Sequence, residues 1–140
     1  MIDRNKREVI TRWSPENIAA NFPLALDEQN HRLFVGCRKP VPWMFVLATG
    51  YGSLMKVHSI SGDPDDLFYD AQRKRIYASC GEGFIDVIEQ GDGDNYETLE
   101  KISTRAGART SYFSPDLNEF YLAVPRRGKE GAEIRVYQPK

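Results

Sequence analysis

The stretch Asp27–Cys37 reads DEQNHRLFVGC, and 43 residues later Asp70–Cys80 reads DAQRKRIYASC. Both begin with Asp, carry Gln and Arg at the same offsets, and end in an apolar run followed by Cys. A third version, SPDLNEFYLAV at Ser114–Val124, begins after another 44 residues and has Glu119 in place of the Arg and Val124 in place of the Cys. Recurrence at a fixed spacing of this length predicts a repeat architecture.

Short apolar runs surround each copy in the same order. They are rich in Val, Ile, Phe and Tyr and are bounded by Gly, Pro, Asp or Asn, which is typical of β-strands. The expected positions are Pro23–Leu26, Leu67–Tyr69 and Ser111–Phe113 for the first strand, Leu33–Cys37, Ile76–Cys80 and Phe120–Val124 for the second, Met44–Ala48, Phe84–Ile88 and Glu133–Tyr137 for the third, and Leu54–Ile60 and Tyr96–Ser103 for the fourth. This spacing predicts an all-β chain of β-propeller blades, which are four-stranded antiparallel sheets; a β-sandwich would not repeat its turn chemistry at a fixed long period.

The order of these strands divides the chain into blades in a circularly permuted way. Residues 1–13 supply a lone closing strand, residues 21–60 form blade 1, and residues 64–103 form blade 2. Residues 108–137 form blade 3, which lacks a fourth strand. In propellers a strand from one terminus commonly completes the sheet at the other, because closure removes an edge that invites aggregation. The whole chain is thus expected to be a single propeller segment.

Several of these stretches resemble a known repeat family. MFVLATGYGSLMKVHSI at Met44–Ile60 is similar to the third strand, turn and fourth strand of YVTN-type bacterial β-propeller repeats, and the opening MIDRNKREVITRW resembles the end of the same unit. PLALDEQNHRLFVGC, DLFYDAQRKRIYASC and GARTSYFSPDLNEFYLAVP are similar to its first half, with LFVGC, IYASC and YLAVP in place of the Tyr-Val-Thr-Asn tetrapeptide. The resemblance implies a propeller repeat protein and suggests export or a periplasmic location, although this chain shows no export signal.

Three blades are too few for a closed ring, which commonly holds about four to eight. An open arc would leave two apolar faces and strand edges in water. We expect a homodimer in which Glu8–Trp13 of each copy completes the Ala132–Tyr137 blade of the other, giving a six-bladed ring with closed symmetry. The side chains expected at this junction are Val9, Ile10, Trp13, Ile134 and Val136. The alternative is that the chain is one part of a longer propeller.

The composition disfavours several classes of partner. Hydrophobic residues make up 41% of the 140 residues, enough for a folded core. Nineteen basic and 20 acidic residues give a net charge of −1, so no overall field favours nucleic acid or an anionic membrane. No apolar run approaches the length of a membrane-spanning helix. The two cysteines occupy the same position of successive repeats, too far apart for a disulfide between stacked sheets, which predicts free, buried thiols.

The residues that open each first strand are the first candidates for a site, because the innermost strands line the channel of a propeller. Asn21, Asp65, Asp66 and Arg109 fall at this channel mouth. A site here would bind a polar ligand or, in the alternative, a divalent cation such as calcium or zinc, with Asp65 and Asp66 as the metal ligands. The sequence favours the structural alternative, in which these two carboxylates end a turn and pair with Arg109 of the neighbouring blade, so no cofactor is expected.

These observations favour a non-catalytic scaffold or module that binds a protein or a small polar ligand through loops at one face of the ring. A second hypothesis is a metal-assisted propeller hydrolase or lactonase, in which a cation at the channel mouth polarises a carbonyl or activates water. A third is a purely structural surface repeat. Two isolated histidines and two unpaired cysteines give no catalytic triad and no zinc spacing, so the sequence predicts no catalytic residue.

Overall fold

A computed structural model describes residues 2–3, 5–14, 16 and 18–140 of the chain. Over these residues the chain forms β-strands and one short 3-10 helix, without an α-helix, and none of its helices is long and apolar enough to cross a membrane. In chain order the elements are β1 Ile2–Asp3, β2 Glu8–Val9, β3 Ala19–Asp27, β4 Arg32–Lys39, β5 Trp43–Ala48, β6 Leu54–Ser59, β7 Pro64–Asp70, β8 Arg75–Cys80, β9 Phe84–Gln90, η1 Asp92–Asp94, β10 Tyr96–Ser103, β11 Thr110–Ser114, β12 Glu119–Val124 and β13 Glu133–Tyr137.

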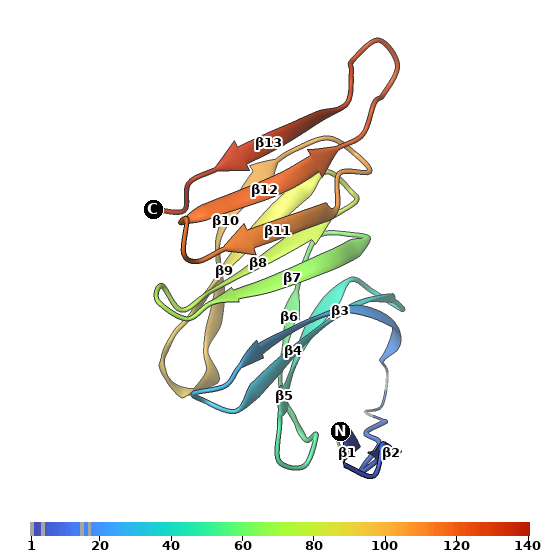
Figure 1. Ribbon diagram of the computed structural model, residues 1–140, viewed down its shortest axis with the longest axis vertical. Helices are drawn as coiled ribbons and strands as arrows, with labels where there is room; N and C mark the ends of the chain where they lie inside the picture. The colour runs from blue at the N-terminus through green and yellow to red at the C-terminus, as the bar shows by residue number, and fades with distance from the viewer. Residues whose placement is uncertain (1, 4, 15, 17) are drawn as a thin grey trace.

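Apart from the two-stranded hairpin of β1 and β2, the described strands form three antiparallel sheets that follow one another along the long axis of the molecule (Figure 1). Blade 1 has the order β3-β4-β5-β6, blade 2 the order β7-β8-β9-β10, and blade 3 the order β11-β12-β13. In each of these sheets every strand pairs with its neighbour along the chain. The first strand of blade 2, β7, lies between the first strands of the other two blades. The all-β fold and the three successive blades predicted from the repeat are confirmed.

The first strands of blades 1 and 2 begin earlier than their apolar runs predict. β3 starts at Ala19 and β7 at Pro64, and each contains a register shift, between Asn21 and Leu24 in β3 and between Pro64 and Asp66 in β7. A bulge of this kind lets polar residues join a strand whose remainder keeps the apolar alternation. Asn21, Asp65 and Asp66 of the predicted channel mouth are therefore part of the sheets, whereas Arg109 lies just before β11.

The repeated acidic turn accounts for the two quoted stretches. Asp27 is buried, and its Oδ1 accepts the backbone N–H of Asn30 at 3.1 Å. Asp70 is buried in the same way and accepts backbone N–H groups of its own turn. A residue in the left-handed region, His31 (φ 56°) in one copy and Lys74 (φ 53°) in the other, then leads the chain into the second strand. Each carboxylate thus satisfies the backbone donors of a tight hairpin.

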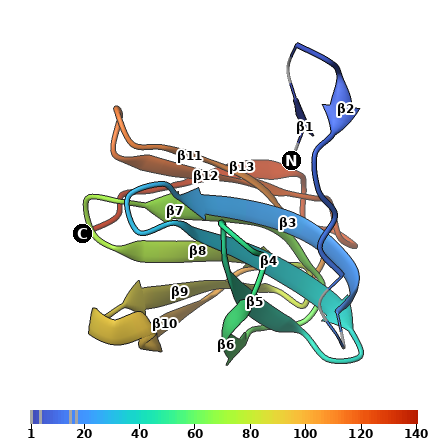
Figure 2. The ribbon, with the colours of Figure 1, turned by 90° about the horizontal axis from the view of Figure 1, so that it is seen from below.

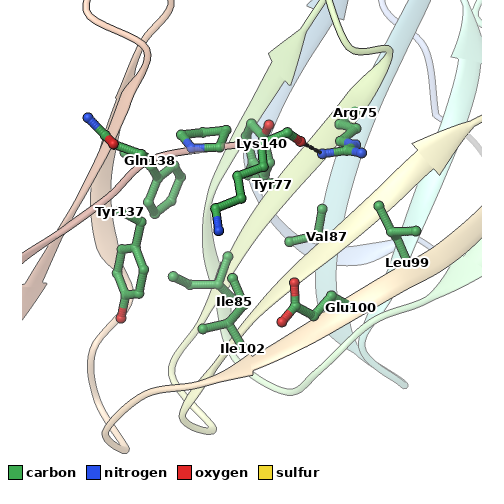
Figure 3. Close-up of a pocket in the computed structure, with 12 residues that line it drawn as sticks. Arg75, Tyr77, Ile85, Val87, Leu99, Glu100, Ile102, Tyr137, Gln138 and Lys140 are labelled. Atoms are coloured by element: carbon green, nitrogen blue, oxygen red, sulfur yellow. Dashed lines mark hydrogen bonds between the residues drawn. The ribbon is translucent and has the colours of Figure 1, made fainter.

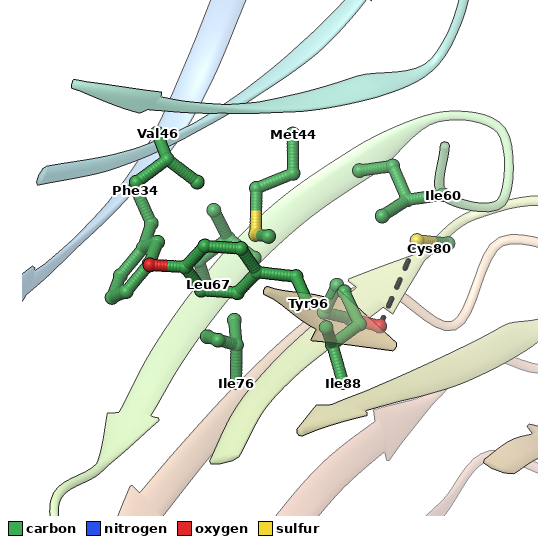
Figure 4. Close-up of a cluster of buried hydrophobic side chains, with 10 residues drawn as sticks. Phe34, Met44, Val46, Ile60, Leu67, Ile76, Cys80, Ile88 and Tyr96 are labelled. Carbon is green, nitrogen blue, oxygen red and sulfur yellow. Dashed lines mark hydrogen bonds between the residues drawn. The ribbon is translucent and has the colours of Figure 1, made fainter. Parts of the chain in front are cut away.

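Apolar side chains fill the two spaces between the blades. Between blades 1 and 2 the buried cluster consists of Phe34, Met44, Val46, Ile60, Leu67, Ile76, Ala78, Cys80, Ile88 and Tyr96 (Figure 4). Between blades 2 and 3 it consists of Tyr77, Ile85, Val87, Ala108, Phe113, Phe120, Leu122 and Val124. Successive residues of a strand point to opposite faces of its sheet, so β8 contributes Ile76 to one cluster and Tyr77 to the other. Each blade is therefore stabilised by its neighbours, as in other repeat proteins.

Cys37 and Cys80 are free and buried, as the repeat spacing predicts. Burial raises the pKa of the Cys37 thiol to about 11 and also raises the pKa of Cys80. Both thiols therefore remain protonated at neutral pH and act as small apolar side chains.

The N-terminal hairpin lies at the opposite end of the long axis from β13 (Figure 1), and in the view along that axis it projects to one side of the blades (Figure 2). Its strands β1 and β2 pair with each other, so the strand predicted over Glu8–Trp13 is shorter in the structure and is paired within its own chain. Trp13 is half-buried and packs on Gly52 in the β5–β6 turn, where any Cβ would clash with the indole ring. Residues 1 and 4 of the predicted closing segment 1–13 lie outside the described residues.

Candidate functional site

Four charged side chains meet where the first strands of the blades begin; we call them the polar cluster. Its members are Arg38 of β4, Asp63 in the turn before β7, Asp65 of β7 and Arg109 just before β11. The Nε atom of Arg38 lies 3.0 Å from Asp63 Oδ1, and that of Arg109 lies 3.4 Å from Asp65 Oδ2. Arg38 also pairs with Asp65, and Arg109 with Asp63. Each carboxylate is therefore shared between arginines that belong to blades 1 and 3.

A recurring turn conformation brings these residues together. Asp63 has a positive φ of 58°, and the residues at the same repeat position, Ala20 (52°) and Gly107 (90°), have positive φ as well. The chain thus enters each first strand through the same left-handed residue. In blade 2 this residue is an aspartate, which places its carboxylate beside Asp65 and next to the guanidinium of Arg109.

The polar cluster is electrically balanced. A hydrogen bond from its guanidinium to Asp63 raises the pKa of Arg109 above its ordinary value, so this side chain stays charged at any accessible pH. The Arg38 guanidinium also lies over the ring of Phe22, with Cζ 4.0 Å from the ring centroid, which adds a cation–π contact. Because the four side chains are partly exposed, each ion pair contributes only up to about 1 kcal/mol. The cluster therefore orients loops of adjacent blades more than it stabilises the fold.

Two of the four residues predicted at the channel mouth belong to the polar cluster. Asp65 and Arg109 form the ion pair that the structural alternative describes. Asp66 does not share this pair, because its Oδ2 accepts the N–H of Ser111 at 2.6 Å and so links β7 to β11. Asn21 is exposed on β3 and lies outside the network of ion pairs. The predicted set is thus divided: Asp65 and Arg109 belong to the ion-pair network, Asp66 links two blades, and Asn21 belongs to neither.

Reasoning from the sequence missed Arg38 and Asp63. Asp63 stands two residues before Asp65 in GDPDD, and its repeat position, shared with Gly107, was a signal for an unusual backbone conformation. Arg38 directly follows Cys37 at the end of the second strand, where the other repeats have Gly81 and Pro125. Nothing in the local pattern shows that this arginine reaches the next blade.

The described residues contain no group of three or more His, Cys, Asp or Glu side chains placed to share a metal ion. Asp65 divides its carboxylate between two arginines, and Asp66 accepts the hydrogen bond from Ser111. A cation held by these two carboxylates would have to displace positively charged partners from one and a backbone donor from the other.

The two end faces of the blade array expose side chains whose repeat equivalents are buried. Ile85 and Val87 of β9 point from blade 2 towards blade 3 and are 2% and 6% exposed. Ile134 and Val136 hold the same register positions in β13 and are 65% and 53% exposed. We call these two side chains the outer face of blade 3. Because Ile85 and Val87 pack on blade 3, the equivalent residues Ile134 and Val136 occupy positions at which a following blade would pack.

In blade 1, side chains of the first strand are exposed whereas their repeat equivalents in blade 2 are buried or partly buried. Leu24 of β3 is 58% exposed, whereas its repeat equivalent Leu67 in β7 is 4% exposed in the core between blades 1 and 2. Leu26 is exposed as well, and its equivalent Tyr69 packs against that core. Leu24 and Leu26, which we call the outer face of blade 1, thus occupy positions that pack on a preceding blade. Contiguous exposed apolar residues of this kind mark interaction surfaces.

The sheet order and these two faces define a class of protein: an arc of β-propeller blades with one face of each end blade uncovered. A solved structure of hydrazine synthase from Kuenenia stuttgartiensis, which contains β-propeller domains, is similar to the chain with a TM-score of 0.78. The similarity covers 98% of this chain at 18% sequence identity, and the chain spans only 38% of the length of that one. At this identity the likeness shows the fold alone. No protein-family model and no curated protein matches the chain.

Proposed function

We propose that the chain is a non-catalytic β-propeller scaffold or binding module that closes into a six-bladed ring with a second copy of itself. The observation that carries the proposal is the exposure of Ile134 and Val136 at register positions that are buried in blade 2. Leu24 and Leu26 are exposed at the other end of the chain. The outer face of blade 3 in one copy can therefore pack on the outer face of blade 1 in the next, which is a head-to-tail contact.

The number of blades supports two copies. A contact between blade 3 of one copy and blade 1 of the next is heterologous, and such contacts form a ring when the rotation closes. Propeller rings commonly hold about four to eight blades, and six is the multiple of three in that range. A ring of two copies would contain two identical junctions related by a two-fold axis along the channel.

Recognition in this proposal takes place at the loops around the channel mouth. A dimer would present two copies of the polar cluster there, each with both signs of charge, a surface suited to a polar ligand or a loop of another protein. The resemblance of the repeats to YVTN-type bacterial propeller repeats supports a binding role and suggests export from the cell.

The oligomeric state tests this proposal directly. We expect light scattering on a sizing column to give twice the 16.0 kDa mass of the chain, stable over a range of concentrations. Replacing both Ile134 and Val136 with lysine is expected to return the mass to that of the monomer, because burying unpaired ammonium groups in an apolar junction costs several kcal/mol.

A matched control separates assembly from general solubility. Leu117→Lys introduces one lysine at a side chain that is 63% exposed in the turn before β12, away from both outer faces, and should leave the dimer intact. A wild-type chain that stays monomeric at all concentrations would contradict the ring of two copies. That result would favour the alternative, in which the remaining blades come from another polypeptide segment.

The cation hypothesis has its own test. We expect neither calcium nor zinc to raise the midpoint of thermal unfolding, because arginines neutralise Asp65 and the N–H of Ser111 occupies Asp66. A stabilisation by either metal that is lost in Asp65→Ala/Asp66→Ala would instead support a cation site and reopen the hydrolase or lactonase hypothesis.

A further inference from the structure

A cavity of about 440 Å³ lies between the outer strands of blades 2 and 3 (Figure 3). Apolar side chains of β9 and β10 form one wall, and Tyr137 of β13 lies across from them. Arg75 lines the cavity at the start of β8, while Glu100 and Lys140 add a charge of each sign. Among the described residues β13 pairs only with β12, so the cavity opens beside a free strand edge.

The preceding pair of blades shows what such a space accommodates. In the core between blades 1 and 2, Tyr96 is 6% exposed and its ring centroid lies 5.9 Å from that of Phe34. Tyr96 opens β10, the fourth strand of blade 2, and shares this buried cluster with Phe34, Met44, Val46 and Ile60 of blade 1. Phe34, Met44 and Val46 lie on the second and third strands of blade 1, and their repeat equivalents in blade 2, Tyr77, Ile85 and Val87, all line the cavity. The cavity is therefore the place of an apolar side chain that would open a fourth strand of blade 3.

A polar partner is missing at the same place. Arg32 of blade 1 donates from Nε and Nη2 to the two carboxylate oxygens of Asp94, at 2.7 and 2.8 Å. Its repeat equivalent Arg75 donates from Nη1 to the main-chain oxygen of Lys140, but its Nε is buried without a hydrogen-bond partner among the described residues. A buried N–H group without an acceptor costs about 1–3 kcal/mol, so this atom marks a site for an incoming acceptor.

We propose that this cavity binds residues Glu8–Ile10 of a second copy, with the Glu8 carboxylate on Arg75 and the Ile10 side chain in the place that Tyr96 takes between blades 1 and 2. The inference rests on the proposed ring and specifies its junction. The spacing of Glu8 and Ile10 matches that of Asp94 and Tyr96 in blade 2, where the acidic residue is also followed two positions later by the residue that packs between the blades. Alternate residues of a strand point to one side, so Glu8 and Ile10 enter the cavity together.

The position and exposure of this segment favour it as the occupant. Ile10 is 57% exposed and Val9 is 47% exposed, so the segment presents apolar surface to solvent. Trp13 fixes its C-terminal end against blade 1, which in a head-to-tail ring lies beside blade 3 of the other copy. Once seated, the segment would extend the sheet at the free edge of β13 by strand addition, and backbone hydrogen bonds would add affinity.

A charge exchange tests the pairing. We expect Arg75→Glu and Glu8→Arg each to raise the dissociation constant of the dimer about tenfold or more, and the double variant to recover most of the loss, as measured by sedimentation. Lys56→Glu makes the same change of charge at an exposed position of β6 outside the cavity and should leave the dissociation constant unchanged. Because Glu8 is exposed, its variant reports on assembly even if substitution of Arg75 impairs folding.

The outcomes separate this inference from the ring itself. A stable dimer that neither substitution weakens would keep the ring and overturn the pairing of Glu8 with Arg75. If the wild-type chain is monomeric, the ring fails, and a synthetic peptide of residues 5–14 titrated by calorimetry becomes the test. Binding that is lost in Arg75→Glu would support the cavity as the site for this segment, and absence of binding would overturn it.

Discussion

Replacing Phe34 with alanine is expected to lower the free energy of unfolding by about 3–5 kcal/mol. The ring is fully buried between blades 1 and 2, and it contacts the rings of Tyr69 and Tyr96 at centroid distances of 5.4 and 5.9 Å. Its removal would leave a cavity in the core that joins the two blades. Because domains are commonly stable by about 5–15 kcal/mol in total, urea unfolding followed by circular dichroism should show a large shift of the midpoint.

Phe22→Ala provides the matched control for this prediction. It removes the same side chain from the same blade, but Phe22 is 56% exposed and contacts mainly the guanidinium of Arg38. We expect it to cost no more than about 1 kcal/mol. Equal losses for the two substitutions would contradict a stabilising role for the buried Phe34 ring in the core between blades 1 and 2.

Replacing Asp27 with alanine is expected to cost about 2–3 kcal/mol in the free energy of unfolding. The buried carboxylate accepts the backbone N–H and the side-chain amide of Asn30 and, from blade 2, the amide of Gln90 at 3.1 Å. Alanine would leave these donors without an acceptor. Asp27→Asn keeps one acceptor oxygen and should lose less, whereas Asp116→Ala in the exposed third turn should change little.

The charge on Asp27 predicts a pH dependence. Burial alone would raise the pKa of Asp27, but the hydrogen bonds from Asn30 and Gln90 outweigh it and hold the pKa below its ordinary value of 3.8. The ionised carboxylate therefore stabilises the fold above that value, and the stabilisation is lost as the pH falls through the lower pKa of the folded state. Unfolding midpoints from about pH 5 to pH 2 should fall more steeply for the wild type than for Asp27→Asn. Parallel curves would contradict this role.

The strands were predictable because their signals are local. In the second repeat the apolar run predicts Ile76–Cys80, and the structure has β8 at Arg75–Cys80. The acidic turns were equally clear, since Asp27 and Asp70 repeat at one spacing and each satisfies donors within its own hairpin. The start of β3 was missed because a bulge near Asn21 interrupts the alternation from which strands are recognised.

The candidate site was less predictable because its contacts join distant parts of the chain. Asp63 and Arg109 are 46 positions apart, and their ion pair depends on how two blades pack. The sequence pointed to Arg109 through its position in the repeat, but local pattern says nothing of the direction of Arg38. The exposure of Ile134 and Val136 follows from the repeat once the third blade is aligned with the second. Both residues could therefore be predicted at the ring junction from the sequence.

The pairing of each blade strand with its neighbour along the chain has a consequence for the folding pathway. Such hairpins join consecutive strands through short loops, which lowers the entropic cost of pairing them. Blade 2 contacts a blade on each side, whereas blades 1 and 3 each contact one within the chain. We therefore expect folding to nucleate in blade 2 and to propagate to blades 1 and 3. The two end blades should unfold locally more easily than blade 2 until a further blade packs on each of them.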